Sequence, residues 1–417
     1  MSRLHRRALL AAIVLAAPAD AGAGADATAA AVRAGLEARG FENVAVDDPG
    51  SPAPLRVFFE NRVLRDELAA LGAAAWIAAA EIEDGRSVTL VPQQRGVVLL
   101  GVTARADDWR DFLSGVLPEP AFRSRVRVVP ADADASLRAG PAAPRSNPSH
   151  RRADVRVRPL FDFQLGVVDD PFRSTERLAP EIVVQPAQGL LLTGQVLVKV
   201  HDGLDPDTRG VAPGRNTLAW GGWLPGGWLG AAGTGVFAGE RWGFAGEIGR
   251  QTRSGRFELR AGGDWSGLLE FRRGATFYTE PDAWSGFVAV TARTERLDLE
   301  VTVTGARFLE GDPGGRIDVE RRFHEAEIGF FGVATHVDKV LGVSLRLPLP
   351  VREWTRPAAL RVTTVPAFPF EYRDTLNEVG QRVSFFDNLD RFRRRLYPTF
   401  VRNNLSDLRR GVPGGSG

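Results

Sequence analysis

Hydrophobic and polar residues alternate one by one over much of the chain after about residue 150. The segment 297–304 alternates strictly, and 195–201 alternates except at Leu197. This period-two pattern predicts β-strands with one apolar and one polar face. Segments of about ten residues with this pattern, separated by turn residues, are typical of a transmembrane β-barrel. We therefore expect a mainly β fold, an antiparallel outer-membrane β-barrel over 153–370.

Turn residues divide the alternating region into segments, which gives an expected barrel of roughly 12–14 strands. In the segment 297–304 we expect the odd-numbered residues to face lipid and the even-numbered residues to face the lumen. A soluble β-sandwich would also alternate and remains the alternative fold. The candidate strands lie near 155–165, 181–186, 190–201, 215–224, 228–238, 242–251, 256–264, 273–279, 284–294, 297–308, 315–322, 325–336, 341–349 and 358–366. Aromatic residues near their ends suit an interfacial girdle: Trp220, Trp223, Trp228, Trp242, Trp265, Phe277, Tyr278 and Trp284.

The region before residue 150 has a different character. We expect a small α/β domain over 27–131, followed by a Pro- and Ala-rich linker over 132–152 and, after the barrel, a polar tail over 371–417. Because this linker is rich in Pro and Ala and few contacts are expected to cross it, the α/β domain is expected to fold independently. The expected elements of this domain are a helix at 27–39, strands at 41–46 and 55–61, a helix at 64–81, strands at 87–92 and 97–103, a helix at 106–113 and a strand at 125–129.

The first 23 residues have the composition of a secretory signal peptide. Arg3, Arg6 and Arg7 precede an apolar run at 8–17 that is too short to span a bilayer. The chain has a formal charge of +2, and removal of the signal leaves it near neutral, so no nucleic-acid partner is expected. The chain contains no cysteine, which excludes disulfides, thiolate sites and a lipid anchor on cysteine.

No residue pattern in the chain predicts catalysis, a cofactor or a metal site. Glu310 and Asp312 form a carboxylate pair that would suit acid–base chemistry on a glycan, although a solvated loop explains them more simply. Arginine side chains in a polar lumen would bind acidic or hydroxylated sugars through paired hydrogen bonds. The candidate polysaccharide-contacting lumen residues are Arg156, Arg158, Gln195, Lys199, Arg307 and Arg321.

Two segments resemble a known family. Residues 56–72, RVFFENRVLRDELAALG, resemble the YENRxYRxEIxALG stretch of the YjbH/GfcD family. Residues 305–315, GARFLEGDPGG, with RRF at 321–323 and LPLP at 347–350, resemble its GRFLxGDxG…RxF…PLP pattern. The resemblance covers 55–370 and implies an outer-membrane β-barrel with a periplasmic α/β part, acting in export or assembly of exopolysaccharide or capsule.

Members of that family commonly carry additional barrel strands before the ENR segment. In this chain the signal leads almost directly into the α/β domain, so a smaller barrel or an assembly with a partner is expected. The expected partners are outer-membrane lipid, the polysaccharide and other exopolysaccharide-export proteins. Two alternatives stay open: a periplasmic glycan-binding or glycan-modifying β-sandwich protein, and a structural barrel plugged by the tail.

Overall fold

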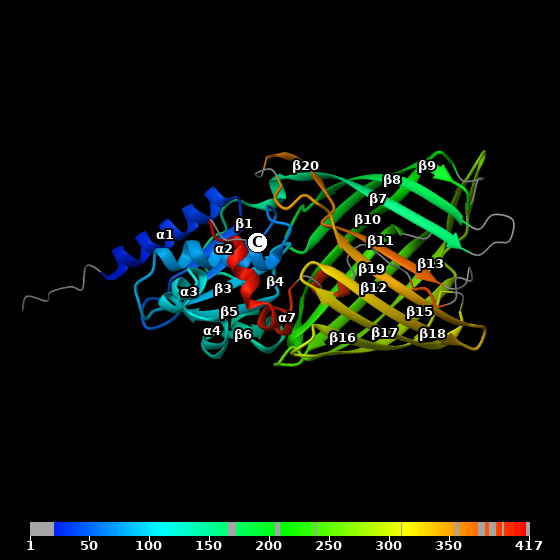
Figure 1. Ribbon diagram of the computed structural model, residues 1–417. Helices are drawn as coiled ribbons and strands as arrows, with labels where there is room; N and C mark the ends of the chain where they lie inside the picture. The colour runs from blue at the N-terminus through cyan, green and yellow to red at the C-terminus, as the bar shows by residue number, and fades with distance from the viewer. Residues whose placement is uncertain are drawn as a thin grey trace, which may run out of the picture.

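The protein is described by a computed structural model that covers residues 21–165, 172–204, 209–237, 240–309, 311–354, 358–373, 380–382, 389–393 and 396–413. Most of the expected signal peptide, Glu310 and parts of the tail lie outside these residues. The fold is mainly β and contains two sheets, one of six strands and one of 15 strands. Figure 1 shows the helices gathered at one end of the larger sheet.

The smaller sheet and its helices form a unit that we call the α/β region. Its strand order is β1-β2-β3-β5-β6, with β4 paired to β3, and only β2 and β3 run parallel. A parallel pair needs a crossover, and α2 supplies it. The elements are α1 (Ala21–Arg39), β1 (Glu42–Asp47), β2 (Leu55–Glu60), α2 (Glu67–Ala80), β3 (Ser87–Gln94), β4 (Val97–Val98), β5 (Leu100–Arg105), α3 (Ala106–Leu113), α4 (Glu119–Arg125) and β6 (Arg127–Pro130).

The α/β region has an apolar core between its sheet and its helices. Helix α2 is rich in alanine, so other chain segments pack closely against it, and Asp66 caps its N-terminus by accepting a hydrogen bond from the N–H of Leu68 at 2.9 Å. Trp109 and Phe112 of α3 are fully buried beside Phe122 of α4. The expected elements of this region agree with the observed ones to within a few residues at most ends, except α4, which was not expected.

The larger sheet, which we call the large sheet, is antiparallel except where β20 meets β7. Each strand pairs with the next along the chain from β7 to β13 and from β15 to β19, while β14 forms a hairpin with β13. Its strands are β7 (Ala153–Leu165), β8 (Phe172–Val184), β9 (Leu190–Asp202), β10 (Val211–Leu224), β11 (Trp228–Phe237), β12 (Arg241–Gln251), β13 (Phe257–Arg272), β14 (Ala275–Tyr278), β15 (Ala283–Arg293), β16 (Leu299–Arg307), β17 (Pro313–Phe323), β18 (Ala326–Thr335), β19 (Lys339–Pro348), β20 (Leu360–Thr364) and β21 (Ala367–Arg373).

The two ends of the large sheet approach each other. Strands β20 and β21 are halves of one segment, and β20 pairs with β7 while β21 pairs with β19. Phe163 of β7 stacks on Phe370 and Tyr372 of β21, with ring centroids 5.0 and 5.3 Å apart. Among the described residues, the continuous hydrogen-bonded path nevertheless runs from β20 to β21 and does not return to its start. The sheet has 15 strands where roughly 12–14 were expected, and the strand that is absent from the expected list is β21.

Burial in the large sheet alternates as the sequence predicts, with apolar side chains outside. In β16, Val303 is 56% exposed, whereas Thr302 and Thr304 are buried on the opposite face. In β12, Phe244 and Ile248 are exposed while Glu247 is buried. No helix among the described residues is long and apolar enough to cross a membrane.

The expected linker is packed against the α/β region instead of spanning open solvent. Its backbone pairs with β1 at Val44 and Ser146, and Asp47 accepts hydrogen bonds from the N–H groups of Ala142 and Ala143. The linker also contains η1 (Ala131–Ala133), α5 (Ala135–Arg138) and η2 (Ser149–Arg151). The sequence did not indicate this packing because most of these contacts are made by backbone groups.

The described part of the tail is also packed, contrary to its expected polar and solvated character. It forms α6 (Leu389–Arg393), α7 (Pro398–Asn403) and η4 (Leu405–Gly411). Leu405 and Leu408 are fully buried in the core of the α/β region, and η4 lies against α2. Gly72 of α2 permits this close approach, because a side-chain carbon there would collide with the carbonyl of Leu408. In Figure 1 the red C-terminal helices accordingly lie beside α2.

Candidate functional site

The large sheet encloses charged and polar side chains on its inner face. Glu181, Glu247, Glu258 and Arg260 are each no more than 5% exposed, and they come from three strands, β8, β12 and β13. Buried charges need partners, because the loss of water around them is otherwise very costly. Glu258 has such partners in Arg293 at 2.6 Å and Arg393 at 3.2 Å.

Four of the six candidate lumen residues lie on this inner face. Arg158 donates to Glu181 at 3.1 Å, and Gln195 donates to the same carboxylate at 3.0 Å. Arg156 pairs with Asp154 at 3.0 Å, and Lys199 pairs with Asp202 at 2.7 Å. Strands β7 and β9 lie on either side of β8 and bring Arg158 and Gln195 together on Glu181, while Lys199 lies further along β9.

The other two candidates, Arg307 and Arg321, lie on the outer face, and their assignment to the lumen is wrong. Arg307 shares the outward parity of Val303 and stacks over the exposed ring of Trp284, 4.2 Å from its centroid. Arg321 stacks over Phe323 at 4.6 Å near the end of β17. Long side chains at strand ends cover apolar rings with their stems while the guanidinium stays in a polar layer. This explains why an outward position accepts arginine.

The structure describes only one member of the expected carboxylate pair. Glu310 lies outside the described residues. Asp312 is only 3% exposed, so it does not lie in a solvated loop as expected, and neither of its carboxylate oxygens has a hydrogen-bond partner within the described chain. No group of three or more potential metal-ligating His, Asp or Glu side chains occurs in the described part of the chain.

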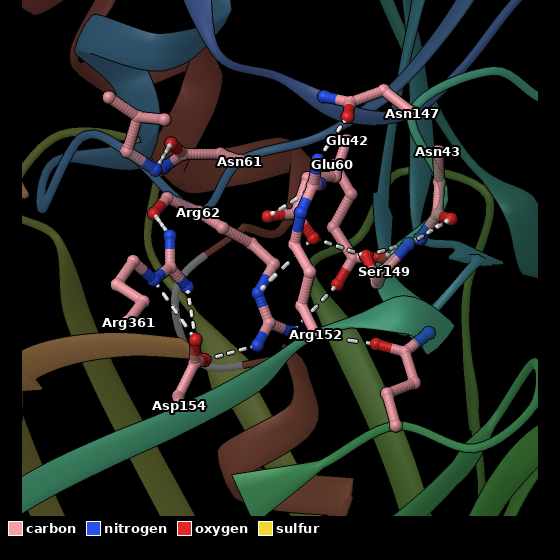
Figure 2. Close-up of polar contacts among 12 residues, drawn as sticks. Glu42, Asn43, Glu60, Asn61, Arg62, Asn147, Ser149, Arg152, Asp154 and Arg361 are labelled. Atoms are coloured by element: carbon pink, nitrogen blue, oxygen red, sulfur yellow. Dashed lines mark hydrogen bonds and ion pairs between the residues drawn. The ribbon is translucent and has the colours of Figure 1, made fainter. Parts of the chain in front are cut away.

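A buried charge cluster joins the α/β region to the large sheet, and we call it the joint cluster. Its centre is Arg62, which pairs with Asp154 and lies 3.6 Å from both Glu42 and Glu60 (Figure 2). Burial disfavours the charge on Arg62, but these three carboxylates outweigh it and raise the pKa of Arg62 above its usual value. The joint cluster consists of Glu42, Asn43, Glu60, Arg62, Ser149, Arg152, Asp154 and Arg361.

The Glu-Asn-Arg sequence at 60–62 gives the joint cluster its geometry. Glu60 ends β2 and accepts from the side chain of Asn43 at 2.6 Å. Asn61 folds the next turn by accepting from the N–H of Leu64 at 2.9 Å and donating to its carbonyl at 2.7 Å. The turn directs Arg62 toward β7. Asp154 lies directly opposite Arg361 of β20 in the sheet register, and their side chains are 2.8 Å apart.

Two cavities lie inside the large sheet and beside the joint cluster. The first, which we call the inner chamber, has a volume of about 420 Å³ and is lined by five arginines and seven carboxylates, among them Arg316, Asp318 and Glu300. The second, which we call the junction chamber, has a volume of about 250 Å³ and is lined by both the α/β region and the large sheet. Arg346 lines both chambers, so they adjoin.

The junction chamber has the more positive wall. The chamber was not foreseen from the sequence, because its residues come from β2, β3, β7 and β20, which are distant in the chain. Its charged lining residues are Glu60, Arg62, Glu67, Arg95, Arg156, Arg158, Arg215, Arg346 and Arg361, which are seven arginines and two glutamates.

The far end of the polar interior, next to the α/β region, is occupied by the tail. The N–H of Leu389 donates to Glu247 of β12, and Phe392 lies against Gly221 of β10. Arg393 pairs with Asp132 of the α/β region at 2.9 Å. Burial raises the pKa of Asp132 above its ordinary value despite this arginine. Helix α6 is thus held between the two regions.

The chain was compared with known proteins. No family model matches it, and no curated protein or solved structure shows significant similarity to it.

Proposed function

We propose that this protein is a non-catalytic outer-membrane β-barrel that assists export or assembly of an exopolysaccharide or capsule. In this proposal the large sheet closes through the segment 360–373, which pairs with β7 at one end and with β19 at the other. The α/β region then lies in the periplasm, where it contacts other export proteins. The resemblance at 56–72 and 305–315 supports the polysaccharide pathway.

The observation that carries the membrane assignment is the reversed distribution of apolar and polar side chains. Large hydrophobic side chains that are at least 37% exposed occur on almost every strand of the large sheet, including Leu192, Phe244, Val288, Val303 and Leu341. In the α/β region only Val116 belongs to this class among the described residues. An apolar exterior of this extent suits lipid and not water.

The location is tested by fractionation of cells that make the protein. We expect recovery with the outer membrane, resistance to extraction by carbonate, and a gel mobility that changes when the sample is heated. Recovery in the soluble periplasm would refute the proposal and favour the glycan-binding β-sandwich.

The role in export is tested by deletion. We expect less surface polysaccharide and polymer retained in the periplasm, with the synthesis of sugar precursors unchanged. Surface polymer of normal amount and altered chemical structure would instead favour a glycan-modifying protein.

A second candidate is a structural barrel whose lumen is plugged, and the position of α6 favours it. Its residues Leu389 and Phe392 are buried against β11 and β12 beside the α/β region. Conductance in planar bilayers separates the candidates. A closed barrel shows no conductance under any condition, and an export pore opens when a partner protein displaces α6.

A further inference from the structure

We propose that the junction chamber is a binding site for an anionic sugar unit, one that carries a carboxylate or a phosphate. The inference deepens the proposed function, because it names the chemical class of polymer that reaches the periplasmic end of the barrel. The site itself depends only on the positions of its residues.

Charge is the first argument. Seven arginines and two glutamates line the junction chamber, whereas carboxylates outnumber arginines in the inner chamber. Carboxylates behind the wall hold these arginines in place, as Asp154 holds Arg156 and Arg361, and Glu181 holds Arg158. Fixed guanidinium groups bind carboxylate and phosphate in a planar, two-point geometry.

Unused hydrogen-bonding capacity is the second argument. Gln93 is 5% exposed and lines the junction chamber, and neither its amide oxygen nor its amide nitrogen has a partner within the described chain. A buried amide without partners costs about 1–3 kcal/mol. A ligand with hydroxyl groups would satisfy both atoms. A residue whose role is to bind a ligand is expected to carry such a cost in the empty site, because its polar atoms find partners only when the ligand is bound.

An aromatic ring is the third argument. Trp354 is half-buried in the lining, and its indole N–H is buried without a partner among the described residues. Indole combines a broad apolar face with a single donor, which suits a sugar ring that has an apolar face and a hydroxyl rim. The volume of about 250 Å³ is slightly below the roughly 300 Å³ at which small-molecule pockets begin. The chamber therefore fits a single sugar unit and not a length of polymer.

The experiment titrates the full-length protein in detergent with small sugars and follows binding by saturation-transfer NMR of the ligand. The probes are D-glucuronate and glucose 6-phosphate as anionic sugars, with glucose and inorganic phosphate as matched controls. We expect an anionic sugar to bind at least about tenfold more tightly than glucose or phosphate, and salt to weaken its binding. Which of the two anionic sugars binds more tightly identifies the acid group. Equal binding of glucose, equal binding of inorganic phosphate, or no binding of either anionic sugar would overturn the proposal.

A pair of variants ties binding to the site. Gln93→Met removes both unpartnered amide atoms and keeps the side-chain volume, so the fold is expected to be at least as stable, while affinity falls about tenfold. Thr193→Val is the matched control, because Thr193 is buried outside both chambers and its hydroxyl has no partner within the described chain. Unchanged affinity in Gln93→Met, or an equal loss in both variants, would overturn the assignment. Fractionation of the wild-type protein tests the outer-membrane barrel separately. A failure of the sugar-binding proposal can therefore be told apart from a failure of the barrel proposal.

Discussion

The α/β region and the large sheet obey opposite burial rules within one chain. In the α/β region, Leu36, Phe59 and Trp109 are fully buried and charges lie mostly outside. In the large sheet, charges such as Glu181 and Glu258 are buried while Leu192 and Val303 are exposed. In the proposed outer-membrane location the large sheet has lipid outside it and the α/β region has water, so the same hydrophobic effect accounts for both patterns. The joint cluster would then lie at the boundary between the two solvents.

The largest effect is expected at that boundary. Asp154→Asn leaves Arg62, Arg156 and Arg361 around a neutral side chain, and loss of one partner of a buried ion pair costs about 3–5 kcal/mol. We expect protease cleavage between the regions and a lower urea midpoint of unfolding. The control is Glu295→Gln, which removes an exposed pair with Arg256 and is expected to leave the midpoint unchanged. An unchanged midpoint in Asp154→Asn would mean that the joint cluster does not hold the regions together.

The second-largest effect is expected when leucine is replaced by alanine in the α/β region, compared with the same replacement in the large sheet. Leu408→Ala opens the core beneath α2 and is expected to cost about 2–5 kcal/mol, with easier proteolysis of residues 396–413. Leu341→Ala, at a position 66% exposed on the outer face, is expected to have almost no effect in detergent. Both are measured by urea unfolding of the detergent-solubilised protein. Equal losses at the two positions would contradict the difference in burial.

A charge on each face of β16 sharpens the comparison within the large sheet. Val303→Arg is expected to cost about 2–4 kcal/mol if the position lies near the middle of the bilayer. Thr302→Arg places the charge in the inner chamber beside Glu300 and Asp318 and is expected to cost much less. Folding into lipid vesicles over a range of urea concentrations measures both. Equal tolerance would show that the outer face does not meet lipid.

The smallest effect concerns a single carboxyl in the α/β region. Burial, followed by the charge of Glu325, raises the pKa of Asp66 above its ordinary value of 3.8, and Arg410 at 3.9 Å does not reverse this. The folded state therefore favours the protonated form, and stability from this group is lost as pH rises through the raised pKa. Asp66→Asn keeps the helix cap and is expected to raise the unfolding midpoint slightly at pH 7. The gain should vanish near pH 3, and a gain that persists there would point to another cause.

Local patterns in the sequence predicted the strands and helices well. The expected strand at 190–201 and the observed β9 differ by one residue, because period-two alternation is a property of neighbouring residues. The outward placement of Arg307 and Arg321 was missed although the parity of Val303 implies the first of them. Arginine is usually found on a polar face, but an arginine at the end of a strand also fits the outer face when its stem covers an aromatic ring.

Contacts between distant segments were not predictable in the same way. Glu60, Asn61 and Arg62 stood out only through a resemblance, since nothing local indicates that Arg62 meets Asp154. The tail appeared polar because Asp390 to Arg395 is highly charged, and its apolar residues, such as Phe400 and Leu405, are widely spaced. The segment η4, which contains Leu405, packs on α2, more than 300 positions earlier in the chain. A pattern within a short window cannot report such a pairing.

The packing of η4 on α2 has a consequence for the order of folding. Helix α2 is synthesised long before Leu405 and Leu408, so the part of its surface that η4 covers stays exposed until the strands of the large sheet have been made. Contacts of such sequence separation form late and slowly. The α/β region therefore keeps an incomplete apolar core until the chain is almost finished. Packing of residues 405–411 on α2 completes this core. The burial of η4 therefore marks the end of folding of the chain.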